Sequence, residues 1–315
     1  MEDTGRIKST LHPVARDIVF DHDLSRSITH ELPHYVNIDR AQTVMLLGAG
    51  LIKVELAKRV LEYLDELEAT SFAAIAHLPA PRGVYLAYED HLRNIVGGEA
   101  ANLHLGRSRN DINATVLKLQ IRSPLVDVAT QLVELLRSLC DRSREFSRTP
   151  FPLYTHRQPA VPSTLGHHLL AFASALLRDL EALLVLLPNL NQSCLGAGVG
   201  GGTSLPIHPR RTARLLGFST PPSNSIDAVA SRDLVLRLLA HGAILGSNLG
   251  RIAETMLLWV GDAGLVVLPD DLVGSSSAMP HKRNPFLLEH IQGKSGTLNG
   301  LLVASLCGMH ATPFT

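Results

Sequence analysis

The 315-residue chain contains 29 Lys and Arg residues and 29 Asp and Glu residues, so its formal net charge is zero. This balance argues against nucleic acid or an anionic membrane as the main partner, because binding to phosphates requires an excess of cations. Charged residues make up only 18% of the chain, against about 25% in average proteins. A globular chain with so few charges is expected to bury extra surface against copies of itself.

The N-terminal residues, the lengths of the apolar runs and the cysteines indicate the compartment. No apolar run approaches the roughly 18 residues of a membrane span, and the first ten residues lack the pattern of a signal peptide. The three cysteines, Cys140, Cys194 and Cys307, are widely spaced and form no C-x-x-C pair. This usage is typical of small core residues in a reducing compartment, and we expect a cytoplasmic, oligomeric protein.

Four long segments repeat apolar residues at steps of three and four, which is the spacing of one helix face. They lie at Val116–Cys140, Leu165–Leu187, Leu234–Trp259 and Phe286–Leu306. At roughly 1.5 Å per residue each helix spans on the order of 35–40 Å, which is typical of a helix bundle. Pro124 is expected to kink the first helix, because proline removes a backbone donor.

The N-terminal part has a different pattern. Residues 1–105 predict shorter helices, of which Thr43–Glu68 is the longest, with loops at Pro79–Gly83 and Gly97–Gly98. We predict an all-α fold with an N-terminal helical domain over residues 1–105 and a central long-helix bundle over residues 106–315.

The loop Val273–Pro285 (VGSSSAMPHKRNP) is the most informative stretch. Three successive serines after a glycine form a turn in which several backbone N–H groups can point at an anion. Ser276, Lys282 and Asn284 then place a hydroxyl, a cation and an amide on one loop, which suits a carboxylate substrate whose charge grows during reaction. The alternative is a solvated, serine-rich linker.

A second polar loop, Tyr154-Thr155-His156-Arg157-Gln158, precedes a long helix. His156 has the side chain best suited to proton transfer near neutral pH, and Thr155 and Gln158 flank it with polar groups. A structural histidine is the alternative. No HExxH or Cys/His ligand set occurs in the chain, so we predict no metal.

A third loop, Gly106–Asp111 (GRSRND), lies at a predicted helix start. Its two arginines, Ser108 and Asn110 can hold a carboxylate, because helix N-termini attract anions and Arg binds carboxylates through two N–H groups. The alternative is that Asn110 or Asp111 is a simple N-cap beside surface arginines.

The glycine-rich segment Gly196–Gly201 formally matches GxGxxG. A dinucleotide fingerprint must follow a strand and open a helix, whereas here an apolar helix precedes the glycines and Pro206 and Pro209 follow them. We therefore do not expect this loop to bind a nucleotide.

Taken together, these loops resemble the signature regions of the fumarase/aspartase superfamily, and most closely those of the argininosuccinate lyase branch. The resemblance runs from about Gly97 to Gly308. In chain order it rests on LHLGRSRND, YTHRQPAVPSTLGHHLL, the segment Asn224–Asp233 with its Ser-Arg-Asp, and SSSAMPHKRNP. Four motifs in the family's order are far more specific than any one of them.

The resemblance implies a mostly helical protomer whose long helices form a homotetramer, with active sites shared between subunits. It also implies β-elimination from an N-substituted aspartate, an N-succinyl compound, with release of fumarate and an amine or guanidine through an aci-carboxylate. No cofactor is implied.

The same resemblance assigns roles to residues of this chain. Ser276 is the expected base, His156 the acid on the leaving-group side, and Glu289 the carboxylate that holds this histidine. Lys282 is expected to stabilise the developing charge. The expected substrate-binding residues are Ser108, Arg109, Asn110, Thr155, Gln158, Arg232 and Asn284.

The chain departs from the family pattern at several points. Ser275 replaces a family glycine, which makes Ser277 a rival for the base, although the position relative to Met279 favours Ser276. The sequence Pro280–Asn284 (PHKRN) is closer to the pattern of the adenylosuccinate lyase branch than to that of the argininosuccinate lyase branch. The segments Gly83–Tyr85 and Asn37–Gln42 replace family contacts on the amine side, and family members carry a further C-terminal helical domain, so we expect it to be missing or truncated here.

Two alternatives to an argininosuccinate lyase therefore remain. One is a lyase of the same superfamily for a different succinyl substrate, of the adenylosuccinate type or from specialised biosynthesis. The other is a non-catalytic, crystallin-like structural relative, against which the joint presence of Ser276, His156 and Lys282 argues.

Overall fold

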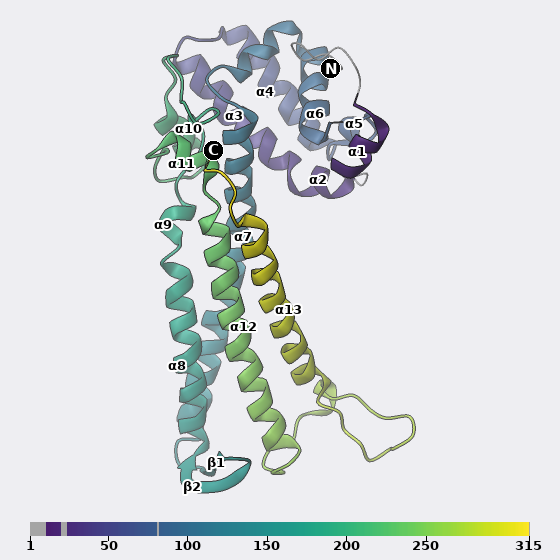
Figure 1. Cartoon of the computed structure of the whole chain (residues 1–315), viewed down its shortest axis with the longest axis vertical. Helices are drawn as coiled ribbons and strands as arrows, with labels where there is room; N and C mark the ends of the chain where they lie inside the picture. The colour runs from purple at the N-terminus through teal and green to yellow at the C-terminus, as the bar shows by residue number, and fades with distance from the viewer. Residues whose placement is uncertain (1–10, 20–23, 81, 315) are drawn as a thin grey trace. The chain divides into compact units, whose positions relative to one another are not determined.

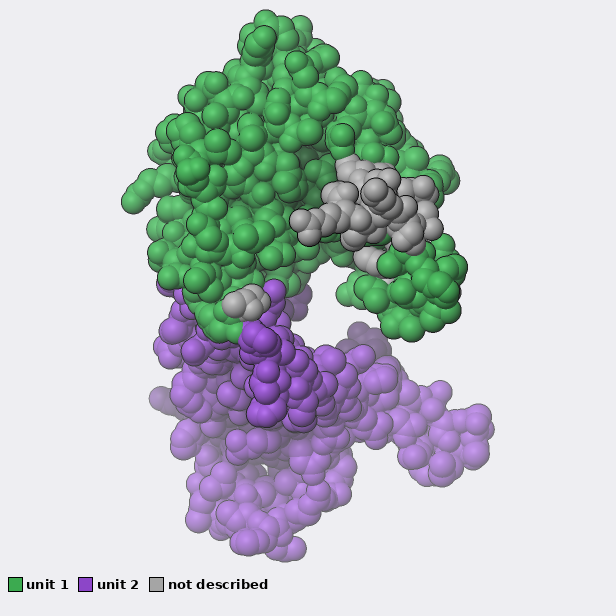
Figure 2. Space-filling view, turned by 45° about the horizontal axis from the view of Figure 1, so that its top comes forward, with its two compact units in different colours: residues 1–124, 190–231, 314–315 green, residues 125–189, 232–313 purple. Residues whose placement is uncertain are grey.

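The computed structural model describes residues 11–19, 24–80 and 82–314. Contacts within the chain divide it into two compact units, which Figure 2 colours separately. Unit 1 comprises residues 1–124, 190–231 and 314–315, and unit 2 comprises residues 125–189 and 232–313. Unit 1 thus includes residues 190–231 from the predicted central bundle, and the domain boundary at residue 105 stays a prediction.

Unit 1 is built from short and medium-length helices. In chain order they are α1 (Pro13–Val19), α2 (Leu24–His30), α3 (Leu32–Gly48), α4 (Val54–Ala69), α5 (Ala73–Ala76), α6 (Val84–Val96), the 3₁₀ helix η1 (Gly98–His104), the first part of α7 (Arg109–Glu145), α10 (Pro209–Leu215) and α11 (Ser225–Ala230). The core of this unit lies between α3, α4 and α6, where Met45, Leu64 and Tyr88 are fully buried.

The single helix predicted over Thr43–Glu68 is wrong, because α3 and α4 are separate helices. The Leu51 N–H donates to the Leu46 carbonyl and the Gly50 N–H donates to the Leu47 carbonyl, which is the hydrogen-bond pattern of a Schellman motif. Gly50 has a φ of 71°, a left-handed conformation that glycine adopts without steric cost. The apolar spacing continues through this turn and concealed the helix end.

Unit 2 contains the long helices. Its elements are the rest of α7, β1 (Pro150–Thr155), β2 (Gln158–Thr164), α8 (Leu165–Leu184), α9 (Leu187–Leu190), α12 (Asp233–Val260), the 3₁₀ helix η2 (Asp270–Leu272) and α13 (Phe286–Met309). Helix α12 packs along both α8 and α13 (Figure 1). The four predicted long helices are therefore confirmed, as is the helical fold class. Pro124 lies inside α7, and its kink stays a prediction.

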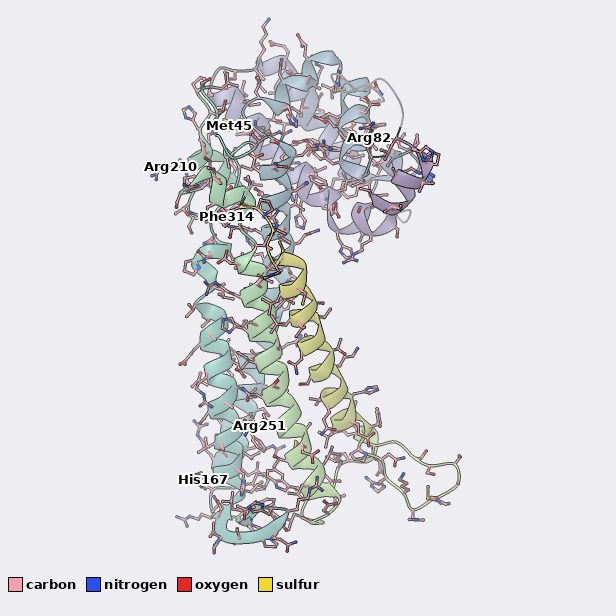
Figure 3. All side chains as sticks on the ribbon, viewed as in Figure 1. Met45, Arg82, His167, Arg210, Arg251 and Phe314 are labelled. Carbon is pink, nitrogen blue, oxygen red and sulfur yellow. The ribbon has the colours of Figure 1, made fainter. Side chains whose placement is uncertain are left out.

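A two-stranded hairpin replaces part of the expected loop between α7 and α8. Strands β1 and β2 pair antiparallel, from Pro150 opposite Thr164 to Thr155 opposite Gln158. His167, labelled in Figure 3, marks the start of α8 directly after β2. In Figure 1 the hairpin lies at the end of the unit where α12 terminates.

Candidate active site

The loop between α12 and α13 is closed at its base. The N–H of Gly274 donates to the carbonyl of Asn284, and the N–H of Asn284 donates to the carbonyl of Gly274, both at 2.8 Å. The Asn284 side-chain amide also donates to the Ser275 carbonyl at 3.4 Å. We call residues 274–284 the serine loop. The closure at its base holds Ser276, Lys282 and Asn284 within one closed loop.

Within the serine loop, Ser276 and Ser277 differ in their backbone hydrogen bonds and in their burial. The N–H of Met279 donates to Oγ of Ser276 at 3.2 Å, and the Met279 carbonyl accepts the N–H of Lys282 at 3.0 Å. Ser276 is half-buried, whereas Ser277 is exposed, and in the described part of the chain no such N–H reaches the Ser277 hydroxyl. A donor aimed at Oγ stabilises an alkoxide, so this geometry favours Ser276 as the base.

His156 and Arg157 form the two-residue turn of the hairpin. Their φ angles are 51° and 59°, so both adopt the left-handed conformation of a type I′ turn. Asn-Gly usually occupies such turns, since a left-handed residue with a side chain costs about 1–2 kcal/mol. Thr155 and Gln158 flank the turn as its last strand pair, and all four residues are exposed in the single chain.

The turn is held by an ion-pair network. Nη1 of Arg157 lies 2.6 Å from Oδ2 of Asp262, and Nη2 lies 2.7 Å from Oε1 of Glu254. The other oxygen of Glu254 accepts a hydrogen bond of 2.8 Å from the Gln292 side chain of α13. We call these four residues the Arg157 clamp. It joins the hairpin, the C-terminal end of α12 and the first half of α13.

Glu289 lies in the first turn of α13 and is exposed. It precedes Gln292 by three residues, so both side chains lie on the same face of the helix. This face is the one that Gln292 directs at Glu254. Within the described chain no hydrogen bond joins Glu289 to His156, and the role of Glu289 as the partner of His156 stays a prediction.

The start of α7 is a capping box. Oγ of Ser108 accepts the N–H of Asn110 at 3.4 Å, while Oδ1 of Asp111 accepts the N–H of Ser108 at 2.8 Å. The N-cap is therefore Ser108, and the alternative that Asn110 or Asp111 is the N-cap is wrong. Arg109 and Asn110 are exposed on the first turn, where an anion is favoured by the helix dipole.

The second oxygen of Asp111 explains the glycine-rich segment. Oδ2 accepts N–H groups from Gly196 at 3.1 Å and Gly198 at 2.9 Å, and both glycines have positive φ. Burial raises the pKa of Asp111, against the three backbone hydrogen bonds that favour its charged form. The backbone N–H groups of Gly196 and Gly198 thus hold a carboxylate of the chain itself.

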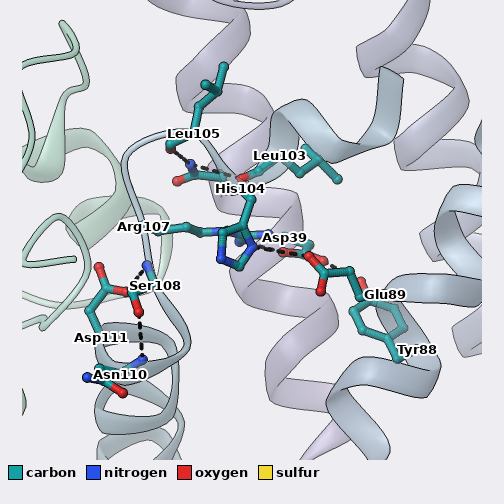
Figure 4. A network of polar contacts seen from close by, with 11 residues as sticks. Asp39, Tyr88, Glu89, Leu103, His104, Leu105, Arg107, Ser108, Asn110 and Asp111 are labelled. Carbon is teal, nitrogen blue, oxygen red and sulfur yellow. Dashed lines mark hydrogen bonds and ion pairs between the residues drawn. The ribbon is translucent and has the colours of Figure 1, made fainter. Parts of the chain in front are cut away.

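Behind the capping box lies a buried charged network (Figure 4). Nη1 of Arg107 lies 2.5 Å from Oδ1 of Asp39, and the side chains of both residues are 3% exposed. The Tyr88 hydroxyl donates a hydrogen bond of 2.5 Å to Oδ2 of Asp39. Burial opposes the charge on Arg107, but Asp39 and the neighbouring tyrosines outweigh it and raise the pKa of the guanidinium. Arg107 precedes Ser108 directly and anchors the loop to Asp39 of α3.

The structure brings together some of the predicted site residues and not others. In unit 2 the hairpin turn, through Arg157, and the helix α13 that carries Glu289, through Gln292, meet at Glu254 near the end of α12. The loop between α12 and α13, which contains the serine loop, projects away from that end of α12 in Figure 1. Arg232 is the N-cap of α12, about 33 Å from Glu254 at 1.5 Å per residue. Ser108, Arg109 and Asn110 belong to unit 1.

Three features of the site were not predicted from the sequence motifs. The S-x-x-D pattern of Ser108 and Asp111 was a readable signal for the capping box. The buried Asp39–Arg107 pair and the Arg157 clamp join residues far apart in the chain and left no local signal. Among the described residues, no group of three or more His, Cys, Asp and Glu side chains could hold a metal ion. No helix in that part of the chain is long and apolar enough to cross a membrane.

The curated proteins to which this chain is similar include argininosuccinate lyases. The enzyme from Methanothermobacter thermautotrophicus is 36% identical over 316 residues, which cover 99% of this chain and 66% of the relative. The enzyme from Methanothrix thermoacetophila is 38% identical over 281 residues, which cover 89% of this chain and 57% of the relative. The chain thus spans about three fifths to two thirds of the length of these relatives.

Solved structures agree with this similarity. EDDS lyase, in complex with formate and as a variant with bound fumarate, matches with a TM-score of 0.85 at 30% identity, over 93% of this chain and 59% of the other. A class II fumarase from Schistosoma mansoni shares the fold, with a TM-score of 0.71 at 20% identity over 88% of this chain and 66% of the other. A family model described as Lyase matches residues 38–300. The chain therefore belongs to this lyase family, within the fumarase/aspartase superfamily.

Proposed function

We propose that the protein is a carbon–nitrogen lyase of the argininosuccinate lyase type, which eliminates a guanidine or amine from an N-succinyl compound and releases fumarate. The observation that carries this proposal is the closed serine loop, in which the Met279 N–H donates to Oγ of Ser276. A serine hydroxyl is a weak base unless its alkoxide is stabilised. The N–H group and the Lys282 ammonium on the same loop supply that stabilisation.

In this mechanism Ser276 removes the proton from the carbon next to a substrate carboxylate. The electron pair moves onto that carboxylate and forms an aci-carboxylate with two negative charges. Preorganised donors at such a group are typically worth about 3–4 kcal/mol each. The proposed donors are Lys282 and Asn284 of the serine loop, with Ser108, Arg109, Asn110, Thr155, Gln158 and Arg232.

Collapse of the aci-carboxylate breaks the bond between carbon and nitrogen. The leaving nitrogen departs poorly without a proton, so an acid is required on the opposite side of the substrate. His156 is the proposed acid, and Glu289 is proposed to hold its imidazole. No step requires a cofactor.

We also propose a homotetramer whose active sites are shared between subunits. Helix α13 carries apolar residues on all of its sides, interspersed with polar ones, yet of its described residues only Leu288 is buried in the single chain. Large exposed apolar side chains follow the rest of the helix: Leu287, Ile291, Leu301, Val303 and Leu306. Contacts with other subunits would bury them.

The cytoplasm is the proposed compartment, because all three cysteines are free. Cys194 is buried, which confirms the predicted core position, and Cys140 is half-buried. Cys307 is exposed on α13, so the core position predicted for it is wrong in the single chain.

Fumarate release tests the function directly. The wild-type oligomer is incubated with argininosuccinate, and separately with adenylosuccinate, while the ultraviolet absorbance of fumarate is followed. We expect Ser276→Ala to lower kcat by about 100-fold or more, since loss of a general base typically costs 10²–10⁴-fold. Ser277→Ala is the matched control and is expected to keep kcat within about twofold of wild type. Equal effects of both substitutions would remove Ser276 from the base role.

A different succinyl amine is the second candidate substrate. The departures at Gly83–Tyr85 and Asn37–Gln42 concern the amine side, and EDDS lyase matches over 93% of the chain. EDDS is therefore included in the same assay. Fumarate release from EDDS alone would assign the second substrate. Failure with all three compounds would favour a non-catalytic relative.

A further inference from the structure

The hairpin turn presents His156 in a conformation that its sequence does not favour. Both turn residues are left-handed and neither is glycine or asparagine. Strained backbone persists only where its surroundings determine it, and such positions cluster at functional sites. The strand pair of Thr155 and Gln158 holds the base of the turn. Its tip needs a separate anchor.

The Arg157 clamp is that anchor. The guanidinium donates through two different nitrogens to two carboxylates, that of Glu254 in the last two turns of α12 and that of Asp262 just beyond its C-terminal end. A planar guanidinium whose two terminal nitrogens are both paired has one orientation. A single exposed ion pair leaves a long side chain free to rotate. The position of Arg157, and with it that of the hairpin turn, is therefore defined with respect to α12.

Gln292 extends the clamp to α13. Its amide donates to the Glu254 oxygen that Arg157 leaves free, so Glu254 is shared between the hairpin and α13. Glu289 lies on the same helix face as Gln292, one turn nearer the N-terminus of α13. The clamp thus connects the element that carries His156 to the element that carries Glu289.

We propose that Arg157 is a positioning residue that, through Glu254, Asp262 and Gln292, holds the imidazole of His156 where the leaving nitrogen is protonated. This inference rests on the proposed function, in which His156 is the acid. Arg157 itself touches neither the substrate nor the reacting atoms. Its removal changes how often His156 is correctly placed, which lowers kcat, and leaves the binding of the succinyl carboxylates in place.

The first test is the steady-state kinetics of Arg157→Ala with the substrate that the wild-type protein converts. We expect kcat to fall by about 10- to 100-fold, the effect of displacing a catalytic group by about 1 Å, while KM changes by less than about threefold. Arg157→Lys retains the charge but not the fork and is expected to recover part of kcat. The matched control is Arg144→Ala, which removes an exposed ion pair with Asp141 of 2.7 Å elsewhere in unit 2 and is expected to leave kcat unchanged.

A second readout is independent of activity. Trp259 is the single tryptophan of the chain and packs against Phe151 at the start of β1, with ring centroids 4.9 Å apart. We expect quenching of its fluorescence by acrylamide to increase in Arg157→Ala and not in Arg144→Ala, because the freed hairpin exposes the ring. If Arg157→Ala loses its oligomeric size, Asp262→Asn, which removes one prong of the clamp, takes its place in both tests.

The outcomes distinguish the positioning role of Arg157 from the proposed role of His156. Wild-type kcat in Arg157→Ala, together with a large loss in His156→Gln, overturns the positioning role and leaves the proposed function intact. Wild-type kcat in His156→Gln overturns the proposed role of His156 itself. A loss of kcat in Arg144→Ala as large as in Arg157→Ala would also overturn the positioning role, since it would be a general effect of losing a surface ion pair.

Discussion

The Asp39–Arg107 pair shows how single residues place the loop Gly106–Asp111, which we predict to bind a substrate carboxylate. Both side chains are 3% exposed, and Tyr88 completes the contact from α6. A buried charge that loses its partner typically costs 3–5 kcal/mol, because no water replaces the lost attraction. We expect Asp39→Asn to lower the free energy of unfolding by about 3 kcal/mol or more. Urea unfolding followed by helical circular dichroism, at one fixed protomer concentration, measures this change.

Asp65→Asn is the control for this prediction. Asp65 also pairs with an arginine, Arg40, at 2.7 Å, but its side chain is 72% exposed. Exposed pairs are worth at most about 1 kcal/mol, so the control is expected to stay within that range. The double replacement Asp39→Leu with Arg107→Met should recover part of the loss, since it leaves no buried charge unpaired. A cost for Asp39→Asn as small as that of the control would contradict a structural role for the pair.

At the scale of elements, the long helices could be predicted because their apolar spacing persists over more than about five turns. The end of α3 could not, since a Schellman turn at Gly50 interrupts the backbone without interrupting the apolar pattern. The hairpin escaped prediction for another reason. Prolines at positions 150, 152, 159 and 162 argue against strands, but a two-stranded ribbon consists only of edges, where a missing N–H is tolerated.

The candidate site was predicted to a similar extent. Its short motifs identified the residue types and their order along the chain, because each motif is local. The capping box of Ser108 and Asp111 follows from the same local spacing. Contacts between distant segments, such as Gly198 with Asp111 or Arg157 with Glu254, depend on the packing of the helices and have no signature at either residue.

An aromatic cluster at the base of the hairpin predicts that stability depends on pH. His168 of α8 packs against both Phe151 and Trp259, with ring centroids 5.3 and 5.4 Å away. Burial, and secondarily the neighbouring His167, lower the pKa of His168 below 6.5. As the pH falls below about 6.5 the unfolded chain therefore takes up a proton that the folded chain resists, and stability decreases.

His168→Phe removes this titration while keeping an aromatic ring in the cluster. We expect the fall in melting temperature between about pH 7.5 and about pH 5.5 to be smaller in this variant than in wild type. Differential scanning calorimetry at the two pH values measures it. His77→Phe, at an exposed histidine of unit 1, is the control and should keep the wild-type dependence. An unchanged pH dependence in His168→Phe would show that another group is responsible.

At the scale of the whole molecule, the length of α12 determines which residues one chain can bring to one substrate. Arg232 precedes the first residue of this 28-residue helix, and the serine loop lies beyond its other end. At 1.5 Å per residue, the helix separates Arg232 from the segment leading to Ser276 by about 42 Å. If both residues act on the same substrate, they must come from different protomers.

This separation predicts complementation between inactive variants. Arg232→Ala and Ser276→Ala are each expected to release little fumarate as homo-oligomers. When the two are unfolded and refolded together, some sites receive the intact Arg232 of one protomer and the intact Ser276 of the other, so part of the activity returns. Ser276→Ala mixed with Lys282→Ala is the control, because the serine loop carries both residues and every site would receive one damaged loop. Sedimentation velocity with differently tagged protomers verifies that both mixtures form mixed oligomers. Equal recovery in the two mixtures, or none in the first, would mean that no site draws on two subunits in this way.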